Sequence, residues 1–276
     1  MSKHVGTKRR TVPEIRARKD GERIVALTAY TTPMAALLDP HVDLLLVGDS
    51  VGMVLHGLPT TVGVTLDMMV MHGQAVMRGS SRALVVVDLP FGTYEESPAV
   101  AHRSAATLMR ETGCQAVKVE TGEGVAETIA FLVGRGIPVL GHVGLRPQAA
   151  HVEGGFRARG RTPSERERVL AEARDSAEAG AFALVVEGVA SDLADEITRA
   201  VDVPTLGIGA SVACDGQILV TEDMLGLFEW TPKFVRRYAD LRGEITTAVE
   251  RFAGDVRQSR FPSEKETYAF RSAATS

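Results

Sequence analysis

A series of short apolar runs, each ending in a polar residue and followed by a helix-like segment, constrains the fold of this chain most strongly. The residues that end these runs are Asp49, Asp88, Glu120, His142 and Glu187. Parallel strands joined by helical crossovers place their carboxyl ends on one face of a sheet or barrel. A lone aspartate is most often a cap of a turn or helix. The repetition therefore predicts one shared site.

The spacing of the runs predicts eight parallel strands that close into a (β/α)8 TIM barrel. The chain has 276 residues, and one such barrel commonly needs ~250. No GxGxxG turn follows the first strand, and residues 207–211 (GIGAS) lack the third glycine of a dinucleotide-binding sheet. We expect strands at residues 23–28, 44–47, 84–87, 116–119, 138–141, 183–186, 204–209 and 217–220.

The ends of the chain predict additions to this barrel within a single domain, residues 1–276. A helix is expected from Thr11 to Gly21, with Pro13 in its first turn, after a flexible arm of residues 1–10. Beyond Pro232, two amphipathic segments up to about Val256 predict a C-terminal helical extension, and residues 257–276 form a polar arm. The long loop 151–162 is typical of a lid or an oligomer contact.

Charge and cysteine content favour a small-molecule site in a cytoplasmic protein. The formal net charge of -4 gives no general attraction to nucleic acid. No run approaches the ~18 apolar residues of a membrane span, and the N-terminus lacks the apolar core of a signal peptide. Cys114 and Cys214 lie outside any CxxC pattern, so neither a zinc site nor a disulfide framework is indicated.

Three of the acids predict a Mg²⁺ site. Asp49, Asp88 and Glu120 offer hard carboxylate oxygens, with no histidine or cysteine cluster near them in sequence. Mg²⁺ keeps several waters, so a few carboxylates and the oxygens of a substrate complete its shell. A 2-oxo acid could supply such oxygens through its carboxylate and ketone, and the ion would then favour the enolate.

The remaining polar strand residues predict roles toward that substrate. Glu187 follows a strand on the far side of the barrel, where a base keeps its basicity away from the metal; a structural ion pair is the alternative. Lys118 points to the same side as Glu120, two residues on, so it neutralises the substrate or pairs with an acid. His142 either donates a hydrogen bond to substrate or orients another group.

Five ordered motifs resemble the ketopantoate hydroxymethyltransferase family. They are LLLVGDSVGM at 44–53, DLPFGTY at 88–94, KVE at 118–120, GHVGLRPQ at 141–148 and DGQILVTEDMLG at 215–226, and the resemblance runs from about Val12 to Ala253. It implies a Mg²⁺-dependent barrel of the phosphoenolpyruvate/pyruvate type, a homodecamer and the first committed step of pantothenate synthesis. It also implies hydroxymethyl transfer from 5,10-methylenetetrahydrofolate to 3-methyl-2-oxobutanoate, giving 2-dehydropantoate.

Carried over position by position, the resemblance assigns roles to the matching residues. Asp49, Asp88 and Glu120 become the metal site and Glu187 the proton acceptor. The oxo acid is bound by Asp49, Ser50, Asp88 and Lys118, with His142 nearby. The sequence departs from the family pattern at Thr31, Thr121 and Ser211, where the family usually has Asp, Gly and Gly.

Two other functions fit the same strand-end pattern. One is another Mg²⁺-dependent barrel enzyme that acts on a 2-oxo acid through an enolate, such as a lyase or a phosphonomutase, with a different second substrate. The other is a catalytically silent barrel, in which we would expect the strand-end acids to be eroded. They are intact.

Overall fold

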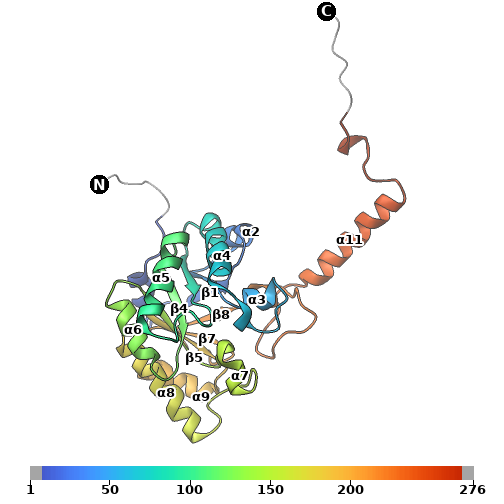
Figure 1. The fold of residues 1–276 in the computed structure, drawn as a ribbon. Helices are drawn as coiled ribbons and strands as arrows, with labels where there is room; N and C mark the ends of the chain where they lie inside the picture. Colours follow the sequence, from blue (N-terminus) through green and yellow to red (C-terminus); the bar gives the residue numbers. More distant parts are fainter. Residues whose placement is uncertain (1–7, 269–276) are drawn as a thin grey trace, which may run out of the picture. The chain divides into compact units, whose positions relative to one another are not determined.

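A computed structural model describes residues 8–268 of the chain and contains a closed barrel of eight parallel strands (Figure 1). Neighbouring strands pair in sequence order, and the eighth returns to the first. The strands are β1 (Ile24–Thr28), β2 (Leu44–Val47), β3 (Leu84–Asp88), β4 (Ala116–Glu120), β5 (Val139–Gly144), β6 (Ala183–Glu187), β7 (Thr205–Ile208) and β8 (Gly216–Leu219). The predicted (β/α)8 barrel is confirmed. The largest difference is in β5, which continues to Gly144, so His142 lies within a strand instead of after it.

Helices lie between consecutive strands except β7 and β8, which residues 209–215 join without a helix. They are α1 (Val12–Arg16), α2 (Thr32–Leu38), α3 (Val51–Val54), α4 (Leu66–Gly79), α5 (Pro98–Thr112), α6 (Val125–Val133), α7 (Ala150–Glu153), α8 (Pro163–Glu178), α9 (Ser191–Ala200), α10 (Thr221–Met224) and α11 (Leu241–Arg257), with 3-10 turns η1 (Thr61–Gly63), η2 (Pro147–Ala149) and η3 (Glu264–Glu266). Several begin at a hydroxyl that accepts a first-turn N–H, as Thr65 does for α4 and Thr162 for α8. Across residues 8–268, no helix combines the length and apolar character that a membrane span requires.

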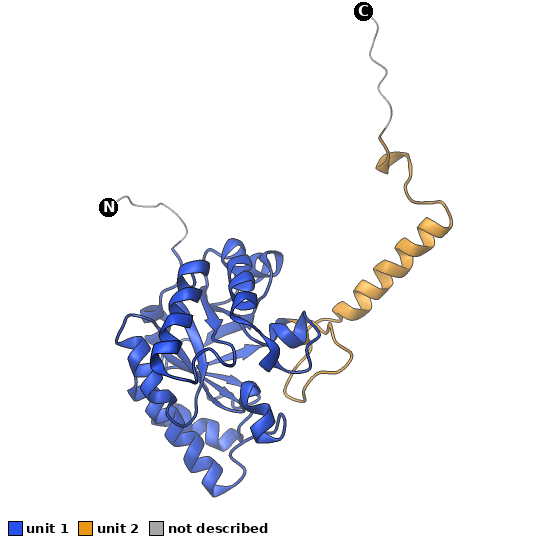
Figure 2. Cartoon of the chain, viewed as in Figure 1, with its two compact units in different colours: residues 1–221 blue, residues 222–276 orange. Residues whose placement is uncertain are grey.

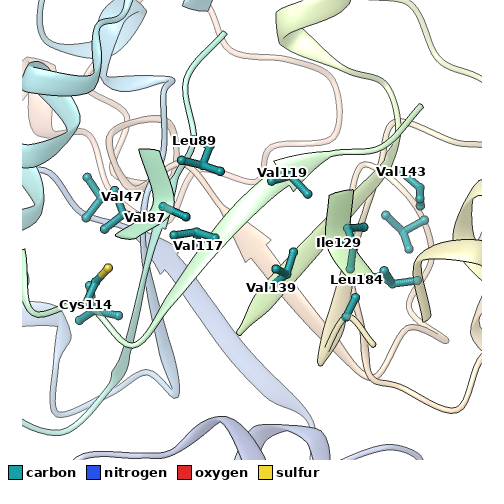
Figure 3. Close-up of a cluster of buried hydrophobic side chains, with 14 of the residues drawn as sticks. Val47, Val87, Leu89, Cys114, Val117, Val119, Ile129, Val139, Val143 and Leu184 are labelled. Carbon is teal, nitrogen blue, oxygen red and sulfur yellow. The ribbon is translucent and has the colours of Figure 1, made fainter. Parts of the chain in front are cut away.

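The barrel strands alternate between two apolar layers, and this alternation aims the polar residues. On β3, Leu84 and Val86 belong to the cluster inside the barrel, while Val85 and Val87 belong to the layer beneath the helices. Figure 3 shows that outer layer, with Val87, Val117 and Val139 among its members. Because side chains alternate along a strand, Asp88 continues the inner row of Leu84 and Val86. The strand-end acids therefore face the barrel axis.

The chain divides into two compact units, residues 1–221 and residues 222–276 (Figure 2). The first unit holds all eight strands. The second holds α11, which we describe by itself. That residues 1–276 behave as one domain stays a prediction.

The N-terminal helix is shorter than predicted. A capping box between Thr11 and Glu14 begins α1 as expected, but the helix ends at Arg16 and not at Gly21. Asp215 accounts for this difference, because its carboxylate accepts the Lys19 ammonium at 3.1 Å and the Asp20 N–H at 2.8 Å. These long-range contacts replace helical hydrogen bonds.

The flexible arm predicted for residues 1–10 ends earlier than expected, because Arg9 and Arg10 contact the barrel. Arg9 donates to the Ala83 carbonyl at 2.7 Å, and the Arg10 N–H donates to the Arg82 carbonyl at 2.7 Å. Residues 9 and 10 are therefore tied to the segment that enters β3. Residues 1–7 lie outside the described part of the chain.

The prediction of two helical segments beyond Pro232 is wrong in part. Residues 231–240 are irregular, and one helix, α11, follows. The Tyr238 N–H donates to the Met224 carbonyl and the Leu241 N–H to the Leu225 carbonyl, so these groups pair across the unit instead of within a helix. Of the predicted polar arm 257–276, residues 269–276 lie outside the described residues.

Candidate active site at the mouth of the barrel

Strand register brings the predicted site residues together in pairs. Asp88 on β3 is the register partner of Lys118 on β4, and Glu120 is the partner of His142 on β5. Glu187 on β6 is opposite Gly144. All these strands end on the same side of the barrel because they are parallel.

Asp49 joins this group from the loop after β2. Its N–H donates to Asp88 Oδ2 at 3.0 Å, and its side chain is buried. Gly48 leaves room for the Ser50 hydroxyl, because a Cβ at this position would lie 2.7 Å from Ser50 Oγ. The two aspartates are thus held in neighbouring positions by the backbone of the turn.

Lys118 and Asp88 form a buried ion pair. Lys118 Nζ donates to Asp88 Oδ1 at 2.8 Å, and both side chains are almost fully buried. Burial alone lowers the pKa of Lys118, but the charges of Asp88, Asp49 and Glu120 outweigh it and raise this pKa. The amine is therefore a permanent cation.

The site contains more negative groups than this one cation can balance. Burial, reinforced by the charge of Asp88, raises the pKa of Asp49 to about 7. Burial and the charge of Asp49 raise the pKa of Glu120 well above its ordinary value, although Lys118 opposes the shift in both acids. A buried carboxyl whose pKa rises is one whose charge lacks a partner. This arrangement is suited to an additional cation.

His142 lies between two of the acids. Its Nε2 is 3.1 Å from Glu187 Oε2 and its Nδ1 is 3.9 Å from Glu120 Oε1. Neither ring nitrogen is aligned for a hydrogen bond with any of residues 8–268. Burial lowers the pKa of His142 despite its contact with Glu187, so the ring is neutral at pH 7. Nε2 thus faces Glu187, and Nδ1 is the ring nitrogen left for a ligand.

Ser50 lies at the edge of the group and contacts Tyr30. The two hydroxyl oxygens are 2.8 Å apart, and Tyr30 is buried. Behind it, the Tyr30 carbonyl is 2.8 Å from His72 Nδ1. The predicted substrate residue Ser50 thus has a buried support that the sequence reasoning did not identify.

Gln148 is a second residue that the sequence reasoning quoted in a motif but gave no role. Its side-chain nitrogen donates to Asp49 Oδ2 at 2.8 Å, and its main-chain N–H contacts both Glu120 oxygens at 3.1 and 3.2 Å. The signal was its place at the end of GHVGLRPQ, after a strand that already carried a site residue.

The carboxylates suit Mg²⁺ by their chemistry, but they do not form a ready-made metal triad. Within residues 8–268, no three His, Cys, Asp or Glu side chains are close enough together to hold an ion by themselves. Both oxygens of Asp88 already accept hydrogen bonds. Mg²⁺ commonly uses one or two protein carboxylates and keeps several waters, so the oxygen donors and the unbalanced negative charge fit this ion.

The three departures from the family pattern are accommodated locally. Thr31 caps α2 by accepting the Met34 N–H, a role that aspartate also performs. The Thr121 hydroxyl donates to the His142 carbonyl at 2.8 Å, and the Ser211 hydroxyl donates to Asp195. None of the departures removes a site carboxylate.

The predicted loop 151–162 is tied down by ion pairs. Arg146 donates to the Thr121 carbonyl at 2.7 Å and to Glu153 at 2.7 Å, and Arg159 also pairs with Glu153. A β-bridge joins Arg159 to Val189, beyond β6. The start of the loop is helical, in α7. Its role as a lid or an oligomer contact stays a prediction.

Comparison with known proteins gives a consistent result. The model of the family described as ketopantoate hydroxymethyltransferase matches residues 9–264. The 3-methyl-2-oxobutanoate hydroxymethyltransferase of Phenylobacterium zucineum (strain HLK1) is 68% identical over 270 residues, covering 97% of this chain and 98% of the relative. The same enzyme of Rhodospirillum rubrum is 61% identical over 267 residues, covering 96% of each chain.

Solved structures extend the similarity of fold. The phosphoenolpyruvate phosphomutase of Streptomyces platensis subsp. rosaceus aligns with a TM-score of 0.60 at 13% identity, covering 95% of this chain and 92% of that one. A 2,3-dimethylmalate lyase of the PEP mutase/isocitrate lyase superfamily aligns with a TM-score of 0.59 at 17% identity, covering 94% and 89%. At these identities the similarity concerns the barrel.

Proposed function

Because this chain belongs to the ketopantoate hydroxymethyltransferase family, we propose that it transfers a hydroxymethyl group from 5,10-methylenetetrahydrofolate to 3-methyl-2-oxobutanoate. The products would be 2-dehydropantoate and tetrahydrofolate. Beyond the family membership, one observation carries the proposal: buried carboxylates exceed the single buried amine at the mouth of the barrel. Such a site suits the binding of a cation together with an anionic oxo acid.

The proposed metal is Mg²⁺, held by Asp49 and Asp88, directly or through water, with Glu120 beside them. The raised pKa values of Asp49 and Glu120 support this, because a cation would supply the charge balance that the metal-free site lacks. When bound, Mg²⁺ would polarise the ketone oxygen of the oxo acid and stabilise the negative charge of its enolate.

The proposed substrate contacts are polar groups around the carboxylates. Lys118 keeps its charge in a buried position and would neutralise developing negative charge on the substrate. The hydroxyl of Ser50, supported by Tyr30, would donate to the substrate carboxylate. His142 would contact the substrate through Nδ1, which has no hydrogen bond among the described residues, while Nε2 faces Glu187.

Glu187 is the proposed base that removes the C3 proton of the substrate. It is partly exposed and lies on the opposite side of His142 from Glu120, so it can reach a ligand. The neutral His142 ring leaves Glu187 without a full ion-pair partner. Its carboxylate is therefore available to a bound substrate.

The lyase and phosphonomutase alternatives share the barrel with the aligned structures, but those structures are only 13 to 17% identical to this chain. The hydroxymethyltransferases are 61 to 68% identical. Formation of tetrahydrofolate from 5,10-methylenetetrahydrofolate, dependent on the oxo acid, separates the proposed reaction from both alternatives.

We also propose a homodecamer that works in the cytoplasm. The family membership supports the assembly, and the two cysteines, which are free and buried, suit a reducing compartment.

Exchange of the substrate C3 hydrogen with deuterated water, followed by NMR without folate, tests the chemistry. The parent protein should catalyse exchange with Mg²⁺, and Glu187→Gln should slow it by ~10² to 10⁴-fold while substrate affinity changes little. Glu178→Gln, an exposed position on α8, is the matched control. A parent that does not catalyse exchange would contradict the proposed function, whereas equal rates in parent and Glu187→Gln would contradict only the base assignment.

A further inference from the structure

Gln148 connects segments that follow several barrel strands. It lies in η2, directly after β5, and only 6% of its surface is exposed. Its hydrogen bonds reach Asp49 after β2, Leu89 after β3 and Glu120 at the end of β4. A buried amide with partners on three segments holds them together firmly when each of its polar groups has a partner.

The side-chain amide is fully used. Its Nε2 donates one proton to Asp49 Oδ2 at 2.8 Å and the other to the Leu89 carbonyl at 3.0 Å. Its Oε1 accepts the Tyr94 hydroxyl at 2.7 Å. Reversing the amide would turn its oxygen toward two acceptors, the Asp49 carboxylate and the Leu89 carbonyl. The two acceptors therefore fix which end of the amide faces Asp49, and the Tyr94 hydroxyl holds the oxygen end in place.

The main chain of Gln148 contacts the second acid independently. Its N–H is shared between the two oxygens of Glu120, at 3.1 and 3.2 Å. A substitution of the side chain thus removes the contact with Asp49 and leaves the main-chain contact with Glu120. The effect on Asp49 can be measured separately.

We propose that Gln148, oriented by Tyr94, is a positioning residue that fixes the Asp49 carboxylate for the metal ion, an inference that rests on the proposed function. Asp49 has buried acids on two sides, Asp88 and Glu120, whose charges repel it. A donor bound to Oδ2 holds the carboxylate in place against this repulsion and leaves Oδ1 for the ion. Hydrogen-bond partners of metal ligands commonly change metal affinity by ~10 to 100-fold when they are removed.

Mn²⁺ binding tests this role without any turnover, because free Mn²⁺ has an electron paramagnetic resonance signal that decreases on binding. Gln148→Met keeps the length of the side chain and removes both donors, so Mn²⁺ affinity should fall by ~10-fold or more. Tyr94→Phe keeps the amide but removes the group that orients it, so affinity should fall less. The double variant should bind as Gln148→Met does, because Tyr94 acts through Gln148.

Gln115→Met is the matched control. Gln115 also uses its amide to hold backbone, accepting the Val85 N–H and donating to the Gly113 carbonyl, but it lies before β4 at the opposite end of the barrel. Its substitution should leave Mn²⁺ affinity unchanged. Melting temperatures in EDTA show whether each variant is folded. If Gln148→Met does not fold, the Mn²⁺ affinity of Tyr94→Phe still tests the inference.

The outcomes separate this inference from the function on which it rests. A parent protein that fails to bind Mn²⁺ overturns the metal site and this inference with it. If the parent protein and Gln148→Met bind Mn²⁺ with equal affinity, only the positioning role is overturned. This holds even if the variant has a lower melting temperature. If the double variant loses Mn²⁺ affinity by the product of the two single losses, Tyr94 and Gln148 act independently. That result would overturn the action of Tyr94 through the amide.

Discussion

Asp49 and Asp88 are neighbouring buried acids whose surroundings give them different properties. Asp88 accepts the Lys118 ammonium at 2.8 Å and the Asp49 N–H at 3.0 Å. Asp49 accepts a hydrogen bond from the neutral amide of Gln148, and burial together with the charge of Asp88 outweighs the opposing charge of Lys118. In the metal-free site the pKa values of Asp49 and Glu120 are therefore the raised ones, so these two carboxyls hold protons more readily than ordinary acids, and the strand-end pattern alone could not distinguish the two aspartates.

This difference predicts a pH dependence. The pKa of Asp49 rises from 3.8 to about 7 in the folded protein, so the folded state holds a proton that the unfolded chain releases. The free energy of unfolding of the metal-free protein should therefore fall as pH rises from about 4 to about 7. Mn²⁺ affinity should rise over the same range, by up to ~tenfold per pH unit for each proton released.

Melting temperatures in EDTA and Mn²⁺ titrations across this range measure both effects. In Asp49→Asn the fall in stability should be reduced, because the amide does not titrate, although Glu120 still contributes in the same direction. An unchanged profile in Asp49→Asn would contradict the assignment to Asp49.

The sequence predicted the identity of most site residues, but it did not predict the residues that hold them in place. Asp88, Lys118 and Glu120 follow from strand alternation, which depends only on neighbours in sequence. Gln148 contacts Asp49, and Tyr94 contacts Gln148, across 99 and 54 positions of sequence. Loop conformations decide such contacts, and apolar periodicity carries no information about them.

At the scale of elements, strand predictions were reliable because buried parallel strands are continuous apolar runs. The errors lie where a long-range partner ends an element. Asp215 takes the N–H of Asp20 and the ammonium of Lys19, so α1 stops early. Tyr238, within the irregular residues 231–240, likewise donates its N–H to the Met224 carbonyl. Local propensity favoured helix in both segments, and tertiary contacts prevailed.

The contact of β5 with β6 gives a prediction at this scale. Gly144 has a φ of +99°, and a Cβ there would collide with the Glu187 carbonyl. Gly144→Ala should therefore lower stability by ~1 to 3 kcal/mol and slow C3 exchange, because the backbone that carries the proposed base must move. Gly136→Ala is the control, since Gly136 has a φ of +81° with no atom within 4 Å of a new Cβ.

Urea unfolding and the exchange assay measure the two effects. Both alanines incur the cost of a positive φ, so the difference between the variants reports the collision at Glu187. Equal stability and equal exchange in the two variants would show that β5 tolerates the added atom without displacing Glu187.

At the scale of the whole molecule, α11 has an apolar side that stays largely exposed, although Phe252 contacts the Phe261 ring of the same unit. The helix has no buried residue. Ile245, Val249, Phe252 and Val256 are 46, 60, 55 and 46% exposed, and their spacing of four, three and four places them on one face. An apolar stripe of this kind commonly marks a protein interface. In a homo-oligomer, a second copy of the chain would cover it.

Charge placed on this stripe should therefore reduce the assembly without affecting the barrel. The parent should scatter light as a large multiple of the 29.5-kDa chain, ten copies in the proposed decamer. Val249→Glu combined with Phe252→Glu should lower that mass, because two carboxylates would have to be desolvated where apolar side chains pack. Glu250→Gln and Arg251→Gln, on other faces of α11, should leave the mass unchanged. Mn²⁺ affinity shows whether the barrel of the charged variant remains intact. A charged variant with the parent mass would place the subunit contacts on other surfaces, and a monomeric parent would contradict the oligomer itself.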